Sequence, residues 1–243
     1  MRAVQRGPLT GLIALVVLLS AFDALVGLDT PGWLAGATLG VLTNGALWLG
    51  LARRGRGPGP ADRVTHARCV LVCAVGTLTV DSFHRPEPVA VLVPLSVVAL
   101  LLDAVDGRVA RRTGTVSRLG ARFDMEVDAL LILVLSGYVA PAVGWWVLAI
   151  GLARYARALG GWLLPWLAGE APARHWGKVV AAVQGVVLAV VAAEVLPHVV
   201  VVGALAGAAV LLAESFGREV GWLWRHRAVG APQPAPELAG VQR

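Results

Sequence analysis

Charged residues are scarce in this sequence: Asp, Glu, Lys and Arg make up 15% of its 243 residues, whereas 57% are hydrophobic. The mean hydropathy is +0.73. A soluble domain of this length needs far more polar surface, so the composition excludes one and predicts apolar surface that faces lipid. The formal net charge is +6, but the basic residues lie in short segments between long apolar runs. This distribution is typical of a membrane protein and argues against a nucleic-acid-binding protein.

Cysteine is almost absent. Cys69 and Cys73 are the only two, and they are four residues apart in one apolar segment. On a helix they would lie one turn apart, which is too constrained for a normal disulfide. No zinc-ligand spacing is present, and no neighbouring motif marks either cysteine as a nucleophile. We interpret both as small residues that pack between helices.

Long apolar segments make up most of the chain, and eight of them have roughly the length of a membrane-spanning helix. Proline, glycine or basic residues separate them. The first segment has no clear small-residue cleavage site after it, so we interpret it as a retained transmembrane helix rather than a signal peptide. The predicted segments are 9–28, 33–52, 64–83, 88–105, 120–141, 144–165, 177–197 and 199–217.

The basic residues predict how these segments cross the membrane. If the N-terminus is cytoplasmic, all of the 21 lysines and arginines except Arg85 lie at or toward the cytoplasmic side. This is the positive-inside pattern of multi-pass membrane proteins. We therefore predict a protein of the cell membrane with both termini in the cytoplasm.

Four aspartates lie on two neighbouring segments that are joined by a short basic loop, Arg108–Arg118. Asp103 and Asp106 are three residues apart, so they share one face of a helix. Asp124 and Asp128, four apart, share one face of the next helix. Because a short loop makes the two helices antiparallel neighbours, we predict that the four carboxylates converge at their cytoplasmic end.

Such an acidic cluster needs compensating positive charge, because like charges repel and carboxylates at membrane depth lose solvation. An oxygen-only set without histidine or cysteine favours Mg²⁺ or Mn²⁺ over zinc. Two such ions clamp a phosphate and stabilise both the attacking and the leaving oxygen. The alternative is that the aspartates pair with the loop arginines, which leaves the nearby glycines and the helical spacing unexplained.

The stretch from Asp103 to Asp128 reads D-x-x-D-G-x-x-A-R-x8-G-x-x-x-D-x-x-x-D. It matches all eight fixed positions of the signature of the CDP-alcohol phosphatidyltransferases, so the sequence resembles that family. Residues 62–68 are similar to the family's N-x-x-T-x-x-R segment, with Asp62 in place of the usual Asn. Residues 177–184 resemble its G-K-x-x-x-x-x-Q pattern, although Val180 and Ala181 replace a frequent Lys-Thr pair.

The resemblance implies an all-α integral membrane protein with a six-helix catalytic core over residues 61–225. Residues 1–60 then form two additional N-terminal transmembrane helices and a basic linker. Residues 226–243, which contain Pro-Gln-Pro-Ala-Pro and no apolar pattern, are expected to be a disordered cytoplasmic tail.

The resemblance also implies an activity that belongs to phospholipid biosynthesis. In this family an acceptor hydroxyl attacks the lipid-bearing phosphate of a CDP-alcohol, such as CDP-diacylglycerol, and CMP is released. Carried over by position, Asp103, Asp106 and Asp124 bind two metal ions, Mg²⁺ or Mn²⁺. Asp128 is the base that deprotonates the acceptor and also contacts metal. The active site is expected to face the cytoplasm.

Contacts to the CDP-alcohol follow in the same way. Gly107 and Ala110 remove side-chain bulk where the nucleotide approaches the helix, and Arg111 is shaped for a bidentate phosphate contact. For Asp62 a helix-capping role is as good an account as a ligand contact. The predicted CDP-alcohol-binding residues are Thr65, Asp103, Gly107, Ala110, Arg111 and Ser117.

The acceptor stays open: glycerol phosphate, inositol phosphate, serine and a lipid-linked alcohol all fit. Arg154, Arg157 and Lys178 are candidates for binding a phosphorylated acceptor, with snorkelling or interhelical pairing as the alternative. The resemblance alone implies a homodimer in contact with membrane lipids.

Two other functions are alternatives to this enzyme activity. A transporter or channel with intramembrane carboxylates would place its acids near the bilayer midplane, often at broken helices, rather than at helix ends. A catalytically inactive lipid-binding relative is disfavoured by the complete signature.

Overall fold

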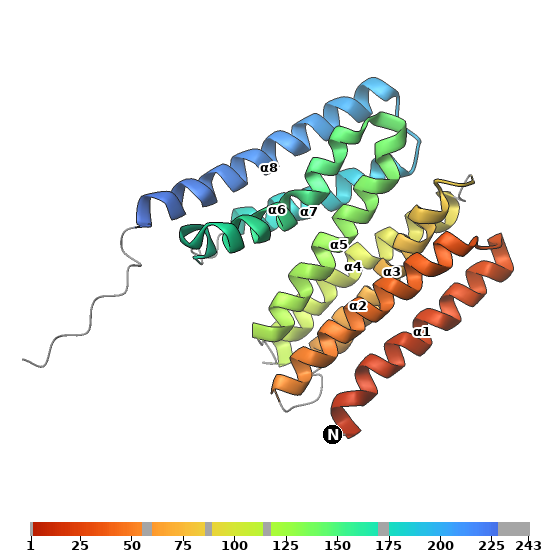
Figure 1. Ribbon diagram of the computed structural model, residues 1–243. Coiled ribbons are helices and arrows are strands. Elements are labelled where there is room, and N and C mark those ends of the chain that lie inside the picture. Colours follow the sequence, from red (N-terminus) through yellow and green to blue (C-terminus); the bar gives the residue numbers. More distant parts are fainter. Residues whose placement is uncertain (1, 55–59, 86–88, 114–117, 170–174, 228–243) are drawn as a thin grey trace, which may run out of the picture.

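The computed structural model describes residues 2–54, 60–85, 89–113, 118–169 and 175–227. Within these ranges every regular element is a helix, as predicted (Figure 1). The predicted tail lies outside the described residues from residue 228 onward. The α-helices are α1 (Arg2–Val26), α2 (Thr30–Arg54), α3 (Pro60–Asp81), α4 (Val89–Thr113), α5 (Arg118–Val143), α6 (Leu148–Leu163), α7 (His175–Ala192) and α8 (His198–His226), and two short 3₁₀ helices are η1 (Trp145–Val147) and η2 (Pro165–Ala168).

Five of these helices are long and apolar enough to cross a membrane: α1, α2, α3, α5 and α8. α4 and α7 contain shorter apolar stretches, Val89–Val105 and Trp176–Ala192. The protein is therefore a multi-pass membrane protein. Among the described residues, length and composition support five of the eight predicted spans.

The predicted segment 144–165 forms a shorter helix than expected. Gly144, with φ of 135°, separates α5 from η1, and α6 ends shortly after the Gly160–Gly161 pair and before Pro165. A φ of this sign is readily adopted only by glycine, and proline cannot continue a helix. α6 has 16 residues. It therefore extends for about 24 Å, less than the roughly 30 Å of a bilayer's hydrocarbon core.

α4, in contrast, is longer than the sequence predicted. The stretch from Arg108 was expected to be a loop, but the helix continues to Thr113. Alanine and arginine are good helix formers, and basic residues near a helix C-terminus interact favourably with its dipole. The first half of the acidic signature is therefore helical, with Asp103 and Gly107 one turn apart.

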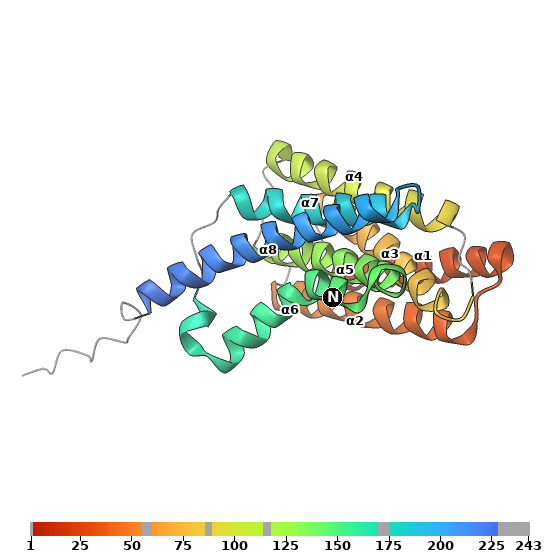
Figure 2. The same ribbon diagram turned by 90° about the horizontal axis from the view of Figure 1, so that it is seen from above.

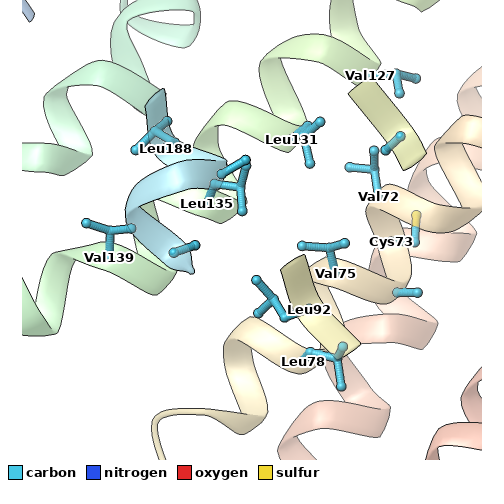
Figure 3. Close-up of a cluster of buried hydrophobic side chains, with 14 of the residues drawn as sticks. Val72, Cys73, Val75, Leu78, Leu92, Val127, Leu131, Leu135, Val139 and Leu188 are labelled. Carbon is cyan, nitrogen blue, oxygen red and sulfur yellow. The ribbon is translucent and has the colours of Figure 1, made fainter. Parts of the chain in front are cut away.

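α3 is the central helix of the fold. It packs against α1, α2, α4 and α5, and 67% of its apolar window is buried inside the protein. Apolar side chains of α3, α4, α5 and α7 meet in one cluster beside it (Figure 3). Its members include Val72, Val75, Leu78, Leu92, Val127, Leu131, Leu135, Val139 and Leu188. This packing fixes α4 and α5, which carry the aspartates, against α3.

The last helices are less enclosed. α7 packs against α4 and α5, and α8 packs mainly against α7. α8 extends beyond the group of helices α1 to α5, as both views of the ribbon show (Figures 1 and 2). Only 17% of its apolar window is buried inside the protein. Most of α8 is therefore left for lipid or solvent.

The two N-terminal helices pack on α3, and their connecting turn is tied to it. Gly27 ends α1 with φ of 66°. The backbone N–H of Asp29 donates to Oδ1 of Asp81, the last residue of α3, at 2.9 Å. Asp81 is fully buried, and Arg85 pairs with its other oxygen at 2.5 Å. Because a buried carboxylate requires such partners, this pairing fixes the α1–α2 turn against the end of α3.

Candidate active site

Three of the predicted aspartates come together beside α3, against which α4 and α5 both pack. Asp103 belongs to α4, and Asp124 and Asp128 lie one turn apart on α5. One carboxylate oxygen from each lies within 4.8 Å of the others. Their side chains are 41%, 33% and 36% exposed, respectively. The cluster is therefore accessible from outside the protein while its oxygens are close enough to share one ion.

Arg68 of α3 lies against this cluster and is the residue that the sequence interpretation left out of the site. Its side chain is 1% exposed. One guanidinium nitrogen, Nη1, pairs with Oδ1 of Asp103 and, at 3.1 Å, with Oδ1 of Asp128. The other, Nη2, pairs with Oδ1 of Asp124 and donates to its main-chain oxygen at 3.2 Å. A single buried guanidinium therefore links the three aspartates of two helices.

The sequence left open the alternative that the aspartates pair with arginines of the loop rather than with a cation. The aspartates do pair with an arginine of α3, Arg68, while several side chains of the predicted loop lie outside the described part of the structure. Burying a guanidinium costs several kcal/mol unless carboxylates compensate it, and its planar fork suits several carboxylate oxygens at once. The signal available in the sequence was the position of Arg68 at the end of the N-x-x-T-x-x-R-like segment.

The cluster fits a divalent cation. Among the described side chains, three carboxylates surround the Arg68 guanidinium, so these four groups together carry a net negative charge. Each carboxylate has two oxygens, and Oδ1 of each lies against Arg68. An exposed set of oxygen ligands with residual negative charge suits Mg²⁺ or Mn²⁺. Asp103, Asp124 and Asp128 are the residues that would hold the ion.

The other predicted donor-binding residues are only partly described. Gly107 lies in α4, one turn beyond Asp103, and Thr65 is buried in α3, three residues before Arg68. Three more predicted residues belong to α4, but their side chains lie outside the described part of the structure: Asp106, Ala110 and Arg111. Ser117 lies outside the described residues altogether.

Two predicted acceptor-binding residues form interhelical ion pairs. Arg154 Nη2 of α6 pairs with Oε1 of Glu126 of α5 at 2.6 Å. Arg157 Nε of α6 pairs with Oε1 of Glu219 of α8 at 3.0 Å. Lys178 is exposed in the first turn of α7. These pairs are the arrangement that the sequence left as the alternative to acceptor binding, and the acceptor role stays a prediction.

Comparison with models of known protein families assigns most of the chain to one family. Residues 60–213 match the model of the CDP-alcohol phosphatidyltransferase family. No curated protein matches the chain, and no solved structure matches it. α1 and α2 precede the matched region, which contains the aspartates and Arg68. Because this region is more than half of the chain and includes the whole acidic signature, the protein belongs to the CDP-alcohol phosphatidyltransferase family and is an enzyme of that family.

Proposed function

We propose that the protein transfers a substituted phosphate group from a CDP-alcohol, such as CDP-diacylglycerol, to an alcohol acceptor and releases CMP. The observation that carries this proposal is the convergence of Asp103, Asp124 and Asp128, from α4 and α5, around one accessible point. A set of carboxylate oxygens suited to a divalent cation fits the transfer of a substituted phosphate group, because the cation stabilises charge on the phosphoryl oxygens.

The reaction exchanges one bond to phosphorus for another. The acceptor oxygen forms a bond to the lipid-bearing phosphorus, and the bond from that phosphorus to the bridging oxygen of the diphosphate breaks. CMP leaves with the electron pair of that bond. The hydroxyl proton goes to the Asp128 carboxylate and from there to solvent. A bound Mg²⁺ or Mn²⁺ would stabilise the negative charge that develops on the phosphoryl oxygens.

The residues of this chain have distinct roles in the proposed reaction. Asp103 and Asp124, with Asp106 by the family resemblance, hold the cation and so place the donor phosphates. Arg68 holds Asp103, Asp124 and Asp128 in one arrangement, so their geometry does not have to form when substrate binds. Gly107, Thr65 and the family positions Ala110, Arg111 and Ser117 are proposed to contact the nucleotide.

The setting of the reaction is also part of the proposal. The positive-inside distribution of Lys and Arg supports a cell-membrane protein whose active site faces the cytoplasm. Lipid donor and product both partition into the bilayer, which suits a site on membrane helices, in the C-terminal half of α4 and the N-terminal half of α5. A homodimer is proposed from the family resemblance alone.

The proposal is tested by product identification. Purified protein in detergent with CDP-diacylglycerol and Mg²⁺ is given glycerol phosphate, inositol phosphate, serine or a lipid-linked alcohol in separate reactions. We expect CMP release with one class of acceptor, together with a new lipid that mass spectrometry assigns to that acceptor. EDTA should abolish both signals. If no CDP-alcohol donor yields CMP with any acceptor, the proposed function is wrong, and a transport assay of the same protein becomes the appropriate experiment.

A further inference from the structure

We infer that α2, which lies outside the family match, is a positioning element of the active site, with Asn44 and Gly50 as its positioning residues. The inference rests on the proposed function of the Asp103, Asp124 and Asp128 cluster. It assigns to one of the two added N-terminal helices a role in setting the distance between α3, which carries Arg68, and α5, which carries two of the aspartates.

The first contact is a buried polar pair between α2 and α3. Asn44 is 3% exposed, and its Nδ2 donates to the main-chain oxygen of Gly40 at 2.8 Å. Its Oδ1 lies 2.7 Å from Nε2 of His66, which is 9% exposed. The amide is thus held at both ends. Leaving either partner of such a buried pair unsatisfied costs about 1–3 kcal/mol, so the pair disfavours sliding of α2 along α3.

The position of His66 makes this pair relevant to the site. His66 lies in the early turns of α3, two residues before Arg68. A Cβ added to Gly11 of α1 would lie 2.1 Å from His66 Nε2, so α1 packs directly over the pair. α1 therefore leaves the imidazole little room to move away from Asn44.

The second contact is between the C-terminal part of α2 and the beginning of α5. A Cβ added to Gly50 would lie 2.5 Å from Cδ1 of Leu119, which is five residues before Asp124. The neighbouring Leu47 and Leu51 are 2% and 0% exposed, so this part of α2 is fully packed on one side. Glycine at position 50 permits the close approach of the two helices.

One helix therefore contacts α3 two residues before Arg68 and α5 five residues before Asp124. At the other end of α3, Asp81 accepts the N–H of Asp29 just before α2 begins. Because α2 is fixed at both ends, it holds α3 and α5 in one position relative to each other. Catalytic and ligand geometries tolerate displacements of only about 0.5–1 Å before rates fall, so this placement matters for the metal site.

A purely structural role for α2 predicts something different. If α2 only shields apolar surface, altering its contacts changes thermal stability and leaves cation affinity and substrate dependence as they are. If α2 positions Arg68 against the aspartates, the same changes weaken cation binding and lower kcat. The Mg²⁺ dependence of CMP release and the direct binding of Mn²⁺ therefore separate the two roles.

The test compares Asn44→Leu and Gly50→Ala with Gly45→Ala in the full-length protein. Gly45 is next to Asn44 on the same helix, and an added Cβ there meets nothing within 4 Å, so its variant is the matched control. We expect Asn44→Leu to weaken Mn²⁺ binding, measured by electron paramagnetic resonance, by roughly 3–10-fold, toward the low end of effects seen for residues that support metal ligands. Gly50→Ala should show a smaller effect in the same direction, and Gly45→Ala none.

A second variant keeps the inference testable if Asn44→Leu does not fold. The double variant Asn44→His, His66→Asn retains a polar pair between α2 and α3, so its Mn²⁺ affinity should stay near the wild-type value. Wild-type Mn²⁺ affinity and unchanged Mg²⁺ dependence in both Asn44→Leu and Gly50→Ala would overturn the inference. A wild-type protein that binds Mn²⁺ but releases no CMP would instead refute the proposed function, and the Mn²⁺ comparison among variants would still decide the role of α2.

Discussion

α3 and α8 are both long apolar helices, but the protein uses them in different ways. In α3, 67% of the apolar window is buried inside the protein, against 17% in α8. α3 contains buried polar residues that pair with other helices, whereas the charged residues of α8 lie on its C-terminal half and are partly or largely exposed. The aspartates of α4 and α5 thus gather around Arg68 of the enclosed helix, where a polar side chain is held in one position.

This difference has a physical cause. A polar group inside a packed helix bundle is tolerated only with partners, and those partners fix its geometry. Arg68 illustrates the case, since three aspartates from two helices surround it. Arg218 of α8 pairs with Glu214 one turn away, and its side chain is 65% exposed. Such a local surface pair adds little stability and positions nothing on another helix.

The largest difference is expected in kcat, when a carboxylate of the aspartate cluster and a carboxylate of α8 are each replaced. Asp128→Asn removes the proposed base from α5 and should lower kcat for CMP release by about 10²–10⁴-fold, while Mn²⁺, held by Asp103 and Asp124, and CDP-lipid still bind. Glu214→Gln on α8 should change kcat by less than about twofold, because its partners are local or exposed. Steady-state kinetics with the identified acceptor, together with Mn²⁺ binding, measures both. Near-normal turnover of Asp128→Asn would remove Asp128 from the role of base.

A smaller difference, in the free energy of unfolding, is expected between substitutions of Arg68 in α3 and Arg218 in α8. Arg68→Leu leaves a group of carboxylates without its buried cation and should lower the free energy of unfolding by about 3 kcal/mol. Arg218→Leu should change it by no more than about 0.5 kcal/mol. Thermal unfolding of both variants in the same detergent provides the comparison. Equal effects of the two substitutions would show that burial does not distinguish these ion pairs.

Glycine substitutions should give the smallest difference in stability between α3 and α8. A Cβ at Gly76 of α3 would lie 2.5 Å from Leu39 Cδ1 and 3.4 Å from Val134 Cγ2, so the Leu39 side chain must shift within the packed interface. Gly76→Ala should cost about 1–3 kcal/mol of stability. Gly207 of α8 has nothing within 4 Å of an added Cβ, and Gly207→Ala should be neutral. A destabilised Gly207→Ala variant would mean that another surface covers this part of α8.

Much of this architecture could be predicted from the sequence, because long apolar runs and their breaks follow directly from the cost of exposing the backbone to lipid. The three described aspartates of the site could be predicted too, since spacings of three and four define a helix face. The length of α4 was missed, because a basic stretch with glycine was interpreted as a loop although Ala110 and the arginines favour helix.

Contacts between distant segments could not be predicted in this way. Arg68 is separated by 35 residues from Asp103 and by 56 from Asp124, and helix periodicity says nothing about which faces meet. Asn44 offered one usable signal, an isolated amide in an apolar run, which in a membrane protein usually faces the bundle interior. Its partner His66 became known only from the packing of α2 on α3.

The central claim is that the aspartate cluster holds the cation on which CMP release depends. The most direct measurement is CMP release from CDP-diacylglycerol during Mg²⁺ titration, with the identified acceptor, for the wild-type protein and for Asp103→Ala. The wild-type rate should rise to saturation with Mg²⁺ and vanish with EDTA. The variant should bind Mn²⁺ more weakly and release CMP far more slowly at every Mg²⁺ concentration. CMP release that is independent of Mg²⁺, or equally fast in Asp103→Ala, would contradict the claim.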